Sequence, residues 1–303
     1  MGHHHHHHEH KKQDFNKAFA IAILLNSAFI LAEIIYGLQA NSLSLLADAG
    51  HNAGDVLGLI LAWGAILLAK RKASERFTYG LQSATIMASL INAIILLVAI
   101  GGISWEAIVR LQNPAAEINT QVVILIASFG ILINGTTALL FVSGSKNDLN
   151  IRSAFLHMGA DALVSLGVVI SAFAIAKSGH MIIDPIVTLI IAVIIIVSTG
   201  KLLIDSIKLS LHAVPESINY SEVKSYLANL KNVNEVHDLH IWAMSTSDIA
   251  LSVHLRMGCV PEHHFLKEIE HHLDHHFGIT HPTIQIETGD SADQCEIISK
   301  HQH

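Results

Sequence analysis

Charged residues are scarce in this chain of 303 residues. Asp, Glu, Lys and Arg make up only 14% of the sequence, whereas 51% of it is hydrophobic. The few charges gather in short loops between long uncharged runs, which is typical of an integral membrane protein. The two cysteines, Cys259 and Cys295, are too few for a disulfide framework, and neither lies in a CxxC pair. The net charge of −7 arises mostly in the last third of the chain and argues against a nucleic-acid-binding protein.

The chain also lacks the phosphate-binding pattern GxxxxGK[ST], so the sequence gives no sign of ATP use. Histidine, by contrast, is abundant, and seven of the 23 histidines lie in MGHHHHHHEH at residues 1–10. An expression tag and a native metal-collecting leader both fit this segment, so we treat residues 1–15 apart from the fold. Residues 289–303 are expected to form a flexible tail.

Long apolar segments occupy the first two thirds of the chain. A spanning helix needs about 20 mostly apolar residues, and six segments meet this length: 16–38, 44–69, 79–106, 119–143, 152–177 and 183–206. The first is too long for a cleavable signal peptide, and no cleavage pattern follows it. The sequence therefore predicts an α-helical membrane protein with six transmembrane helices in residues 16–208.

The Lys and Arg residues near these segments are distributed unevenly. Eleven of them belong to the loops on one side, and only Arg110 and Lys177 belong to the other. Because positive charge near a span resists translocation, this bias places both termini of the multi-pass chain in the cytoplasm.

The pattern changes after Lys208. Residues 209–288 predict a cytoplasmic domain whose strands alternate polar and apolar residues, as in HDLHIWAM. The expected elements are a helix, two strands, a helix and a strand, at 221–231, 235–244, 248–256, 262–277 and 282–288. The order αββαβ is typical of a small α+β domain of ferredoxin-like type.

Ionisable residues inside the apolar segments are the strongest functional signal. His51 and Asp55 are four residues apart in the second segment, as are His157 and Asp161 in the fifth, so each pair lies on one helix face. With a rise of 1.5 Å per residue, Asp55 and Asp161 fall about 18 and 16 Å from the outer surface. Two imidazoles and two carboxylates at one depth suit a tetrahedral divalent ion, and zinc fits this ligand mixture best. Asp48 lies nearer the end of its span, where a helix-terminal or interhelical hydrogen bond explains it at least as well as metal binding.

These residues resemble the zinc-transporting members of the cation diffusion facilitator family. The resemblance covers residues 16–288 and includes SLSLLADAGHNAGD, HMGADALVSLGVVI, the Asp184–Pro185 dipeptide and VHDLHIWAMS. It implies a homodimeric exchanger in the lipid bilayer that carries Zn²⁺ out of the cytoplasm against protons. The short SGSKNDLN loop suggests a bacterial member, and hence the inner (plasma) membrane. The chain departs from the family's FGYxRxE pattern after Phe77, where Arg and Glu are missing.

The resemblance also implies a cytoplasmic metal site. The matching positions are His237, His254 and Glu287, with Gln285 where some relatives have His. Such a site would bind Zn²⁺ as a regulatory ligand, in addition to zinc as the transported substrate. His240 is three residues from His237, which on a regular strand places the two side chains on opposite faces. Six histidines on the second helix form either further metal clamps or a solvated, pH-sensitive face: 263, 264, 271, 272, 275 and 276.

Proton exchange is the mechanism that these ligands favour. Because a ligating His must be neutral and a ligating Asp ionised, protons compete directly with the metal, and alternating access would then exchange one for the other. The sequence leaves three alternatives: transport of Co²⁺, Cd²⁺ or Fe²⁺, a zinc-sensing receptor without transport, and a membrane metallohydrolase. A hydrolase needs an open coordination position and a general base such as the Glu of HExxH, but Asn52 follows His51, so we expect no enzyme.

Overall fold

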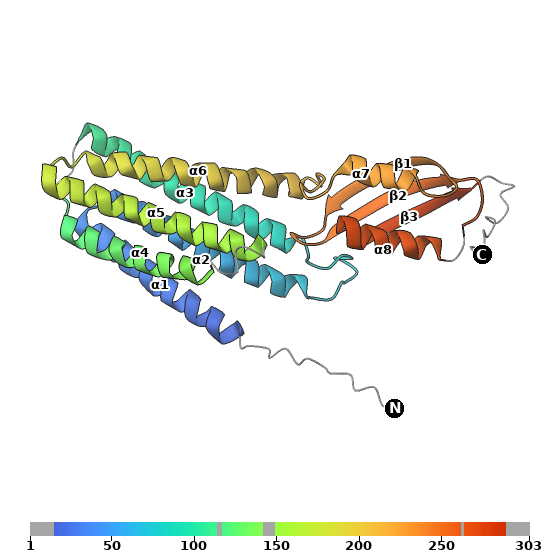
Figure 1. Cartoon of the computed structure of the whole chain (residues 1–303), viewed down its shortest axis with the longest axis horizontal. Coiled ribbons are helices and arrows are strands. Elements are labelled where there is room, and N and C mark those ends of the chain that lie inside the picture. The colour runs from blue at the N-terminus through green and yellow to red at the C-terminus, as the bar shows by residue number, and fades with distance from the viewer. Residues whose placement is uncertain (1–14, 114–116, 142–148, 262–263, 289–303) are drawn as a thin grey trace, which may run out of the picture. The chain divides into compact units, whose positions relative to one another are not determined.

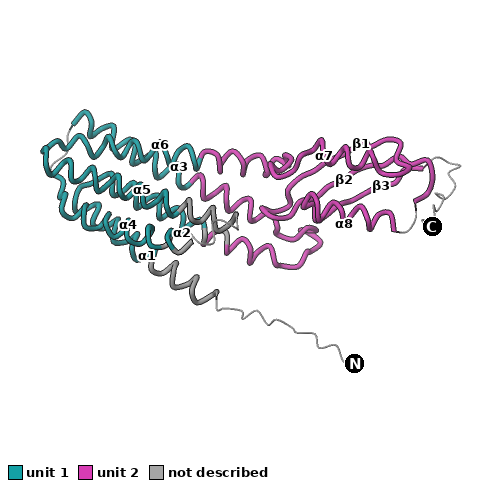
Figure 2. The backbone as a smooth tube through the Cα atoms, viewed as in Figure 1, with its two compact units in different colours: residues 1–59, 95–199 teal, residues 60–94, 200–303 magenta. Residues whose placement is uncertain are grey.

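The computed structural model describes residues 15–113, 117–141, 149–261 and 264–288. The predicted leader (apart from Phe15) and the predicted tail at 289–303 lie outside the described residues. The chain divides into two compact units, residues 1–59 with 95–199 and residues 60–94 with 200–303 (Figure 2). We call them unit 1 and unit 2.

Long helices form where the sequence predicts apolar segments (Figure 1). Their bounds are α1 Phe15–Ala40, α2 Leu43–Ala69, α3 Ala84–Gln112, α4 Thr120–Phe141, α5 Leu149–Ser178 and α6 Ile183–Ser210. Among the described residues, four helical stretches are long and apolar enough to cross a membrane: α2, α3, α6 and the part of α5 from Met158 to Ser178. The expected start of the third segment at residue 79 is wrong. A turn with Gly80 at φ +71° precedes α3 and stops a helix from forming there.

Unit 1 packs its helices around a core of small and branched side chains that includes Leu45, Val123, Val168 and Ile191. Close approach depends on a glycine in α4. A Cβ atom built on Gly130 would lie 2.9 Å from Ser165 Oγ and 3.2 Å from Phe29 Cζ. Because Gly130 has no side chain, α4 can lie directly against both α1 and α5.

The N-terminus of α2 is fixed by a carboxylate from α6. Asp184 is 1% exposed and accepts four hydrogen bonds. The donors are Ser42 Oγ at 2.8 Å, Leu43 N at 2.7 Å, Ser44 N at 3.2 Å and Ser44 Oγ at 2.6 Å. These bonds satisfy backbone N–H groups that have no partner within the helix, and the negative charge opposes the positive end of the helix dipole. The contact holds the start of the helix that carries His51 and Asp55.

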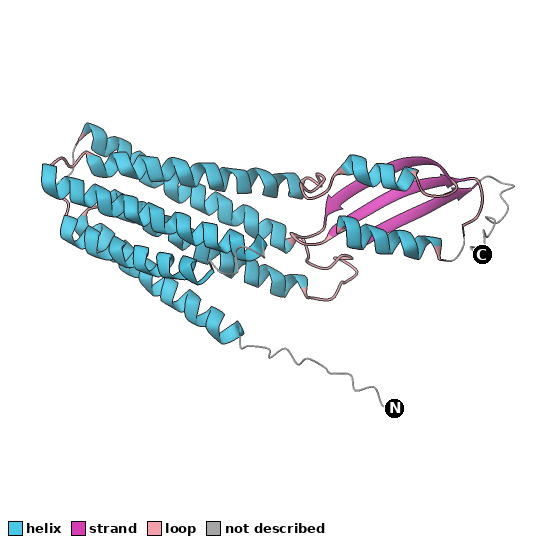
Figure 3. Cartoon of the chain, in the orientation of Figure 1, coloured by secondary structure: helices cyan, strands magenta, loops and turns pink. Residues whose placement is uncertain are grey.

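Unit 2 contains a three-stranded sheet with two helices on one face, as Figure 3 shows. The elements follow in the expected order: α7 Tyr220–Ala228, β1 Val233–Ala243, β2 Ile249–Met257, α8 Phe265–Phe277 and β3 His281–Thr288. Strand β2 lies in the centre, antiparallel to β1 and parallel to β3. Buried side chains of both helices, such as Leu227 and Leu273, pack on Leu251 and Leu255 of β2. The opposite face of the sheet carries its polar residues.

A β-bulge interrupts β1 in the motif HDLHIW. His237 pairs with His254, and His240 pairs with Ser252, so three steps along β1 match two along β2. The extra residue is accommodated where Asp238 adopts a φ of +51°. Because the bulge shifts the alternation by one residue, the expectation that His237 and His240 lie on opposite faces is wrong. Both lie on the face away from the helices.

The turn after β1 contacts the start of α3 within unit 2. Ser83 Oγ donates a hydrogen bond to the Met244 carbonyl oxygen at 3.2 Å, and Thr246 N donates to Thr85 Oγ1 at 3.0 Å. Strand β1 is therefore linked through its C-terminal turn to the first residues of a long apolar helix.

Candidate metal centres

One cluster of metal-ligating groups lies among the helices of unit 1. His51 and Asp55 come from α2 and Asp161 comes from α5, and one ligand atom of each lies within 4.8 Å of the others. His51 Nε2 is 3.1 Å from Asp161 Oδ1. Asp161 is 2% exposed, and the other two side chains are partly buried. One nitrogen and two carboxylate oxygens at this spacing can close around a divalent ion.

The fourth predicted ligand, His157, belongs to α5, but its side chain lies outside the described residues. Its position in the sequence is one helical turn before Asp161. The structure thus brings three of the four predicted ligands together, from two helices more than 100 residues apart in sequence.

Two further carboxylates are buried in unit 1. Asp48 is 0% exposed and accepts a hydrogen bond from Ser165 Oγ of α5 at 2.7 Å, which is the interhelical role expected for it. Glu33 of α1 is also 0% exposed and accepts a hydrogen bond from Asn52 Nδ2 of α2 at 3.1 Å. Glu33 is not among the residues predicted from the sequence, although a single carboxylate in an apolar segment is itself a signal of function.

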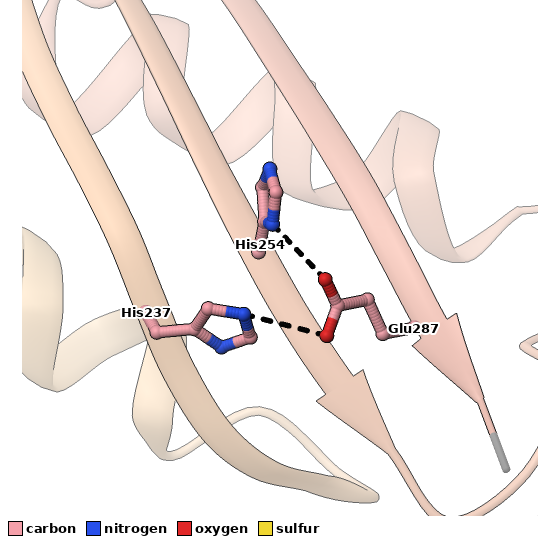
Figure 4. Close-up of side chains that lie close together, drawn as sticks. All are labelled: His237, His254 and Glu287. Atoms are coloured by element: carbon pink, nitrogen blue, oxygen red, sulfur yellow. Dashed lines mark hydrogen bonds and ion pairs between the residues drawn. The ribbon is translucent and has the colours of Figure 1, made fainter.

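A second cluster lies on the open face of the sheet in unit 2 (Figure 4). The three adjacent strands contribute His237, His254 and Glu287, one residue each. Glu287 Oε2 is 3.3 Å from His237 Nε2, and Glu287 Oε1 is 3.0 Å from His254 Nδ1. All three side chains are partly exposed, and His237 Nδ1 is buried without a hydrogen-bond partner. The arrangement offers two nitrogens and a carboxylate to a cation at the open face of the sheet.

The bulge in β1 brings more ligand atoms to this face. Asp238 Oδ1 is 2.9 Å from His240 Nε2, and Asp238 Oδ2 is 3.6 Å from His254 Nε2. The hydrogen bond with His240 holds the pKa of the Asp238 carboxyl below its usual value. Gln285 pairs with His254 in the sheet, and its Nε2 donates to Glu287 Oε1 at 3.4 Å. An amide at this position supports the carboxylate instead of adding a nitrogen ligand.

The histidines of α8 form stacked pairs and not a third cluster of this kind within the described residues. The ring centroids of His271 and His275 are 4.2 Å apart, and those of His272 and His276 are 4.1 Å apart. Tyr226 of α7 stacks on His272 at 4.0 Å. Partial burial lowers the pKa of His272, and the nearby His276 and His271 lower it further.

Comparison with known proteins gives matches along nearly the whole chain. Residues 19–209 match the family model described as the cation efflux transmembrane domain, and residues 215–289 match that of the cation efflux protein cytoplasmic domain. Among solved structures, the metal-bound C-terminal domain of the CzcD transporter from Cupriavidus metallidurans is 32% identical. The match covers 23% of this chain and 99% of that domain. The TM-score of this match is 0.20.

Three bacterial transporters are similar over most of their length. The cadmium, cobalt and zinc/H⁺-K⁺ antiporter of Bacillus subtilis is 34% identical, covering 95% of this chain and 92% of the relative. The metal cation efflux system protein CzcD of Cupriavidus metallidurans is 32% identical over 95% and 90%. The zinc transporter ZitB of Escherichia coli is 33% identical over 92% and 91%. The chain therefore belongs to the cation efflux family of membrane transporters, also called the cation diffusion facilitators.

Proposed function

We propose that this protein exports Zn²⁺ from the cytoplasm in exchange for protons. The observation that carries the proposal is the cluster of His51, Asp55 and Asp161 among apolar helices. A receptor that only senses zinc has no need to place ligands there, because burying ionisable groups between membrane helices is costly. The relatives named as zinc transporter and as zinc/H⁺ antiporter support both the ion and its counter-ion.

The proposed transporter consists of a membrane part and a cytoplasmic part. Residues 16–208 form six transmembrane helices with both termini in the cytoplasm, and residues 209–288 form a ferredoxin-like cytoplasmic domain. The protein acts as a homodimer in the bacterial inner membrane. The bias of Lys and Arg between the loops supports the orientation, and the family of the cytoplasmic domain supports the assembly.

The transport site works by competition between zinc and protons. His51 Nε2 binds zinc only when it carries no proton, and the carboxylates of Asp55 and Asp161 bind it only when ionised. His157 is the fourth ligand in this scheme and would complete a tetrahedron. With the site open to the cytoplasm, zinc displaces protons from these groups. With the site open to the outside, protons return and release the ion. Zinc and protons each shift the equilibrium between the two states toward the state that binds them more tightly.

The cytoplasmic cluster has a regulatory role in this proposal. Zinc bound between His237, His254 and Glu287 would link three strands at the surface of the domain. A ligand changes the transport rate only through its different affinity for two conformations. The hydrogen bonds from the turn after β1 to the start of α3 provide a physical connection from this sheet to a membrane helix.

Cadmium and cobalt are a second candidate range of substrates, because the Bacillus subtilis relative is named for both. Ligands of nitrogen and oxygen seldom select among divalent metals by affinity alone.

Transport by purified protein in liposomes tests the proposal. An imposed pH gradient should drive Zn²⁺ uptake, and Asp55→Asn should abolish it, since the amide keeps the shape of the side chain but loses its charge. The matched control is Glu106→Gln, which makes the same chemical change at an exposed side chain paired with Arg110 at 3.1 Å. Zinc uptake that ignores the pH gradient would refute the antiport, and an active Asp55→Asn variant would remove Asp55 from the site.

A further inference from the structure

Two buried carboxylates remain outside the zinc cluster. Glu33 and Asp48 are both 0% exposed. Each has one oxygen that accepts a hydrogen bond, from Asn52 and Ser165 respectively. The other oxygen of each, Glu33 Oε1 and Asp48 Oδ1, is buried without any hydrogen-bond partner. Within the described residues, no Lys, Arg or His forms an ion pair with either group.

Among the described residues, negative charge but no cation acts on Glu33. Asp48 of α2 is the charged group that acts on Glu33. Around Asp48 itself, His51 and Asp161 are the charged groups. Helix α4, which packs against α1, has no titratable side chain in its sequence. Two ionised carboxylates buried from water repel each other and lose their hydration, and one proton bound to the pair reduces both costs.

We infer that Glu33, together with Asp48, carries a counter-transported proton at a position separate from the zinc ligands. This inference rests on the proposed zinc/proton exchange and names where one of its protons resides. A proton bound at Glu33 Oε1 cancels one of the two charges and turns an acceptor without a partner into a donor. Its loss restores both charges and the repulsion between them.

The hydrogen bonds of this carboxylate pair connect it to the zinc ligands. Asn52, which donates to Glu33, directly follows His51 in α2. Ser165, which donates to Asp48, lies four residues and thus one turn after Asp161 in α5. A change of charge at the pair therefore acts on hydrogen bonds of the same two helices that hold the metal. The pair biases the helix arrangement without itself binding zinc.

The test measures proton and zinc fluxes together in proteoliposomes that contain the full chain. Glu33→Gln keeps the size of the side chain and an acceptor for Asn52 but cannot exchange a proton. The ratio of protons to zinc should fall by about one, while zinc-for-zinc exchange without a pH gradient stays within about threefold of the parent rate. Asp48→Asn should lower the ratio in the same way. Glu106→Gln is the matched control and should keep the parent ratio.

The outcomes separate this inference from the proposed function. A parent protein without proton coupling would refute the antiport, and the inference with it. A coupled parent whose ratio is unchanged in Glu33→Gln overturns the inference alone. If zinc-for-zinc exchange is lost in Glu33→Gln and is not restored in Glu33→Asp, Glu33 is structural and the inference is again wrong. Repeating the flux assay without K⁺ identifies the counter-ion. If zinc transport then depends on K⁺ and not on the pH gradient, the site binds potassium and the inference is wrong.

Discussion

The carboxylate of Asp184 should contribute more to the stability of unit 1 than any surface charge. Its four hydrogen bonds divide unequally, because Oδ1 accepts from Ser42 Oγ, Ser44 N and Ser44 Oγ, whereas Oδ2 accepts only from Leu43 N. Asp184→Ala removes all four bonds and leaves buried donors without partners. A hydrogen bond to a charged group contributes about 1.5–3 kcal/mol, but bonds to one group do not add. We expect a loss of about 4 kcal/mol in the free energy of unfolding, which is close to a thousandfold change in the equilibrium constant for unfolding.

Asp184→Asn should be intermediate. An amide oxygen in place of Oδ1 keeps three bonds, but its NH₂ group faces the N–H of Leu43 and the charge at the helix N-terminus is lost. Loss of one bond and of a dipole interaction of about 0.3–1 kcal/mol predicts a destabilisation of about 2 kcal/mol.

Unfolding in SDS, followed by the helical circular dichroism of the detergent-solubilised protein, measures these differences. The matched control is Asp205→Asn, on the same helix, where the carboxylate is partly exposed and 3.7 Å from Lys208 Nζ. Such an ion pair contributes about 0–1 kcal/mol. An unfolding free energy of Asp184→Ala within about 1 kcal/mol of this control would contradict the expected loss, and so would an Asp184→Asn variant that is no more stable than Asp184→Ala.

Two further predictions concern the metal centres. His51→Asp should retain some transport and raise the rate with Cd²⁺ relative to Zn²⁺, because it replaces a nitrogen ligand by oxygen and changes the mixture of two His and two Asp that fits zinc best. Uptake measured with each metal checks this, and an unchanged ratio of the two rates contradicts it. Replacing His237 and His254 together by Ala should leave transport intact but flatten the dependence of the initial rate on cytoplasmic zinc. A rate curve identical to that of the parent would make these histidines structural.

Local patterns in the sequence were sufficient for the helices, the strands and most of the candidate ligands. Apolar length predicts α2 and α6, and alternation predicts β1 and β2, because each signal depends only on neighbouring residues. The four-residue spacing of His51 and Asp55 fixes a shared helix face for the same reason. The pairing of that face with Asp161 could be anticipated because both residues fall at similar depth in antiparallel spans.

Only the tertiary structure decided the features that join distant residues or interrupt the regular alternation of a strand. The bulge at Asp238 moves His240 to the face of His237, and a strict alternation cannot show this because one inserted residue reverses it. The capping of α2 by Asp184 joins residues 140 or more positions apart. Glu33 obtains its significance from Asn52 and Asp48 on another helix. The sequence by itself determined which groups could bind a cation, whereas packing between helices and strands determined which of them meet, because hydrogen bonds between distant segments leave no periodic signal in the chain.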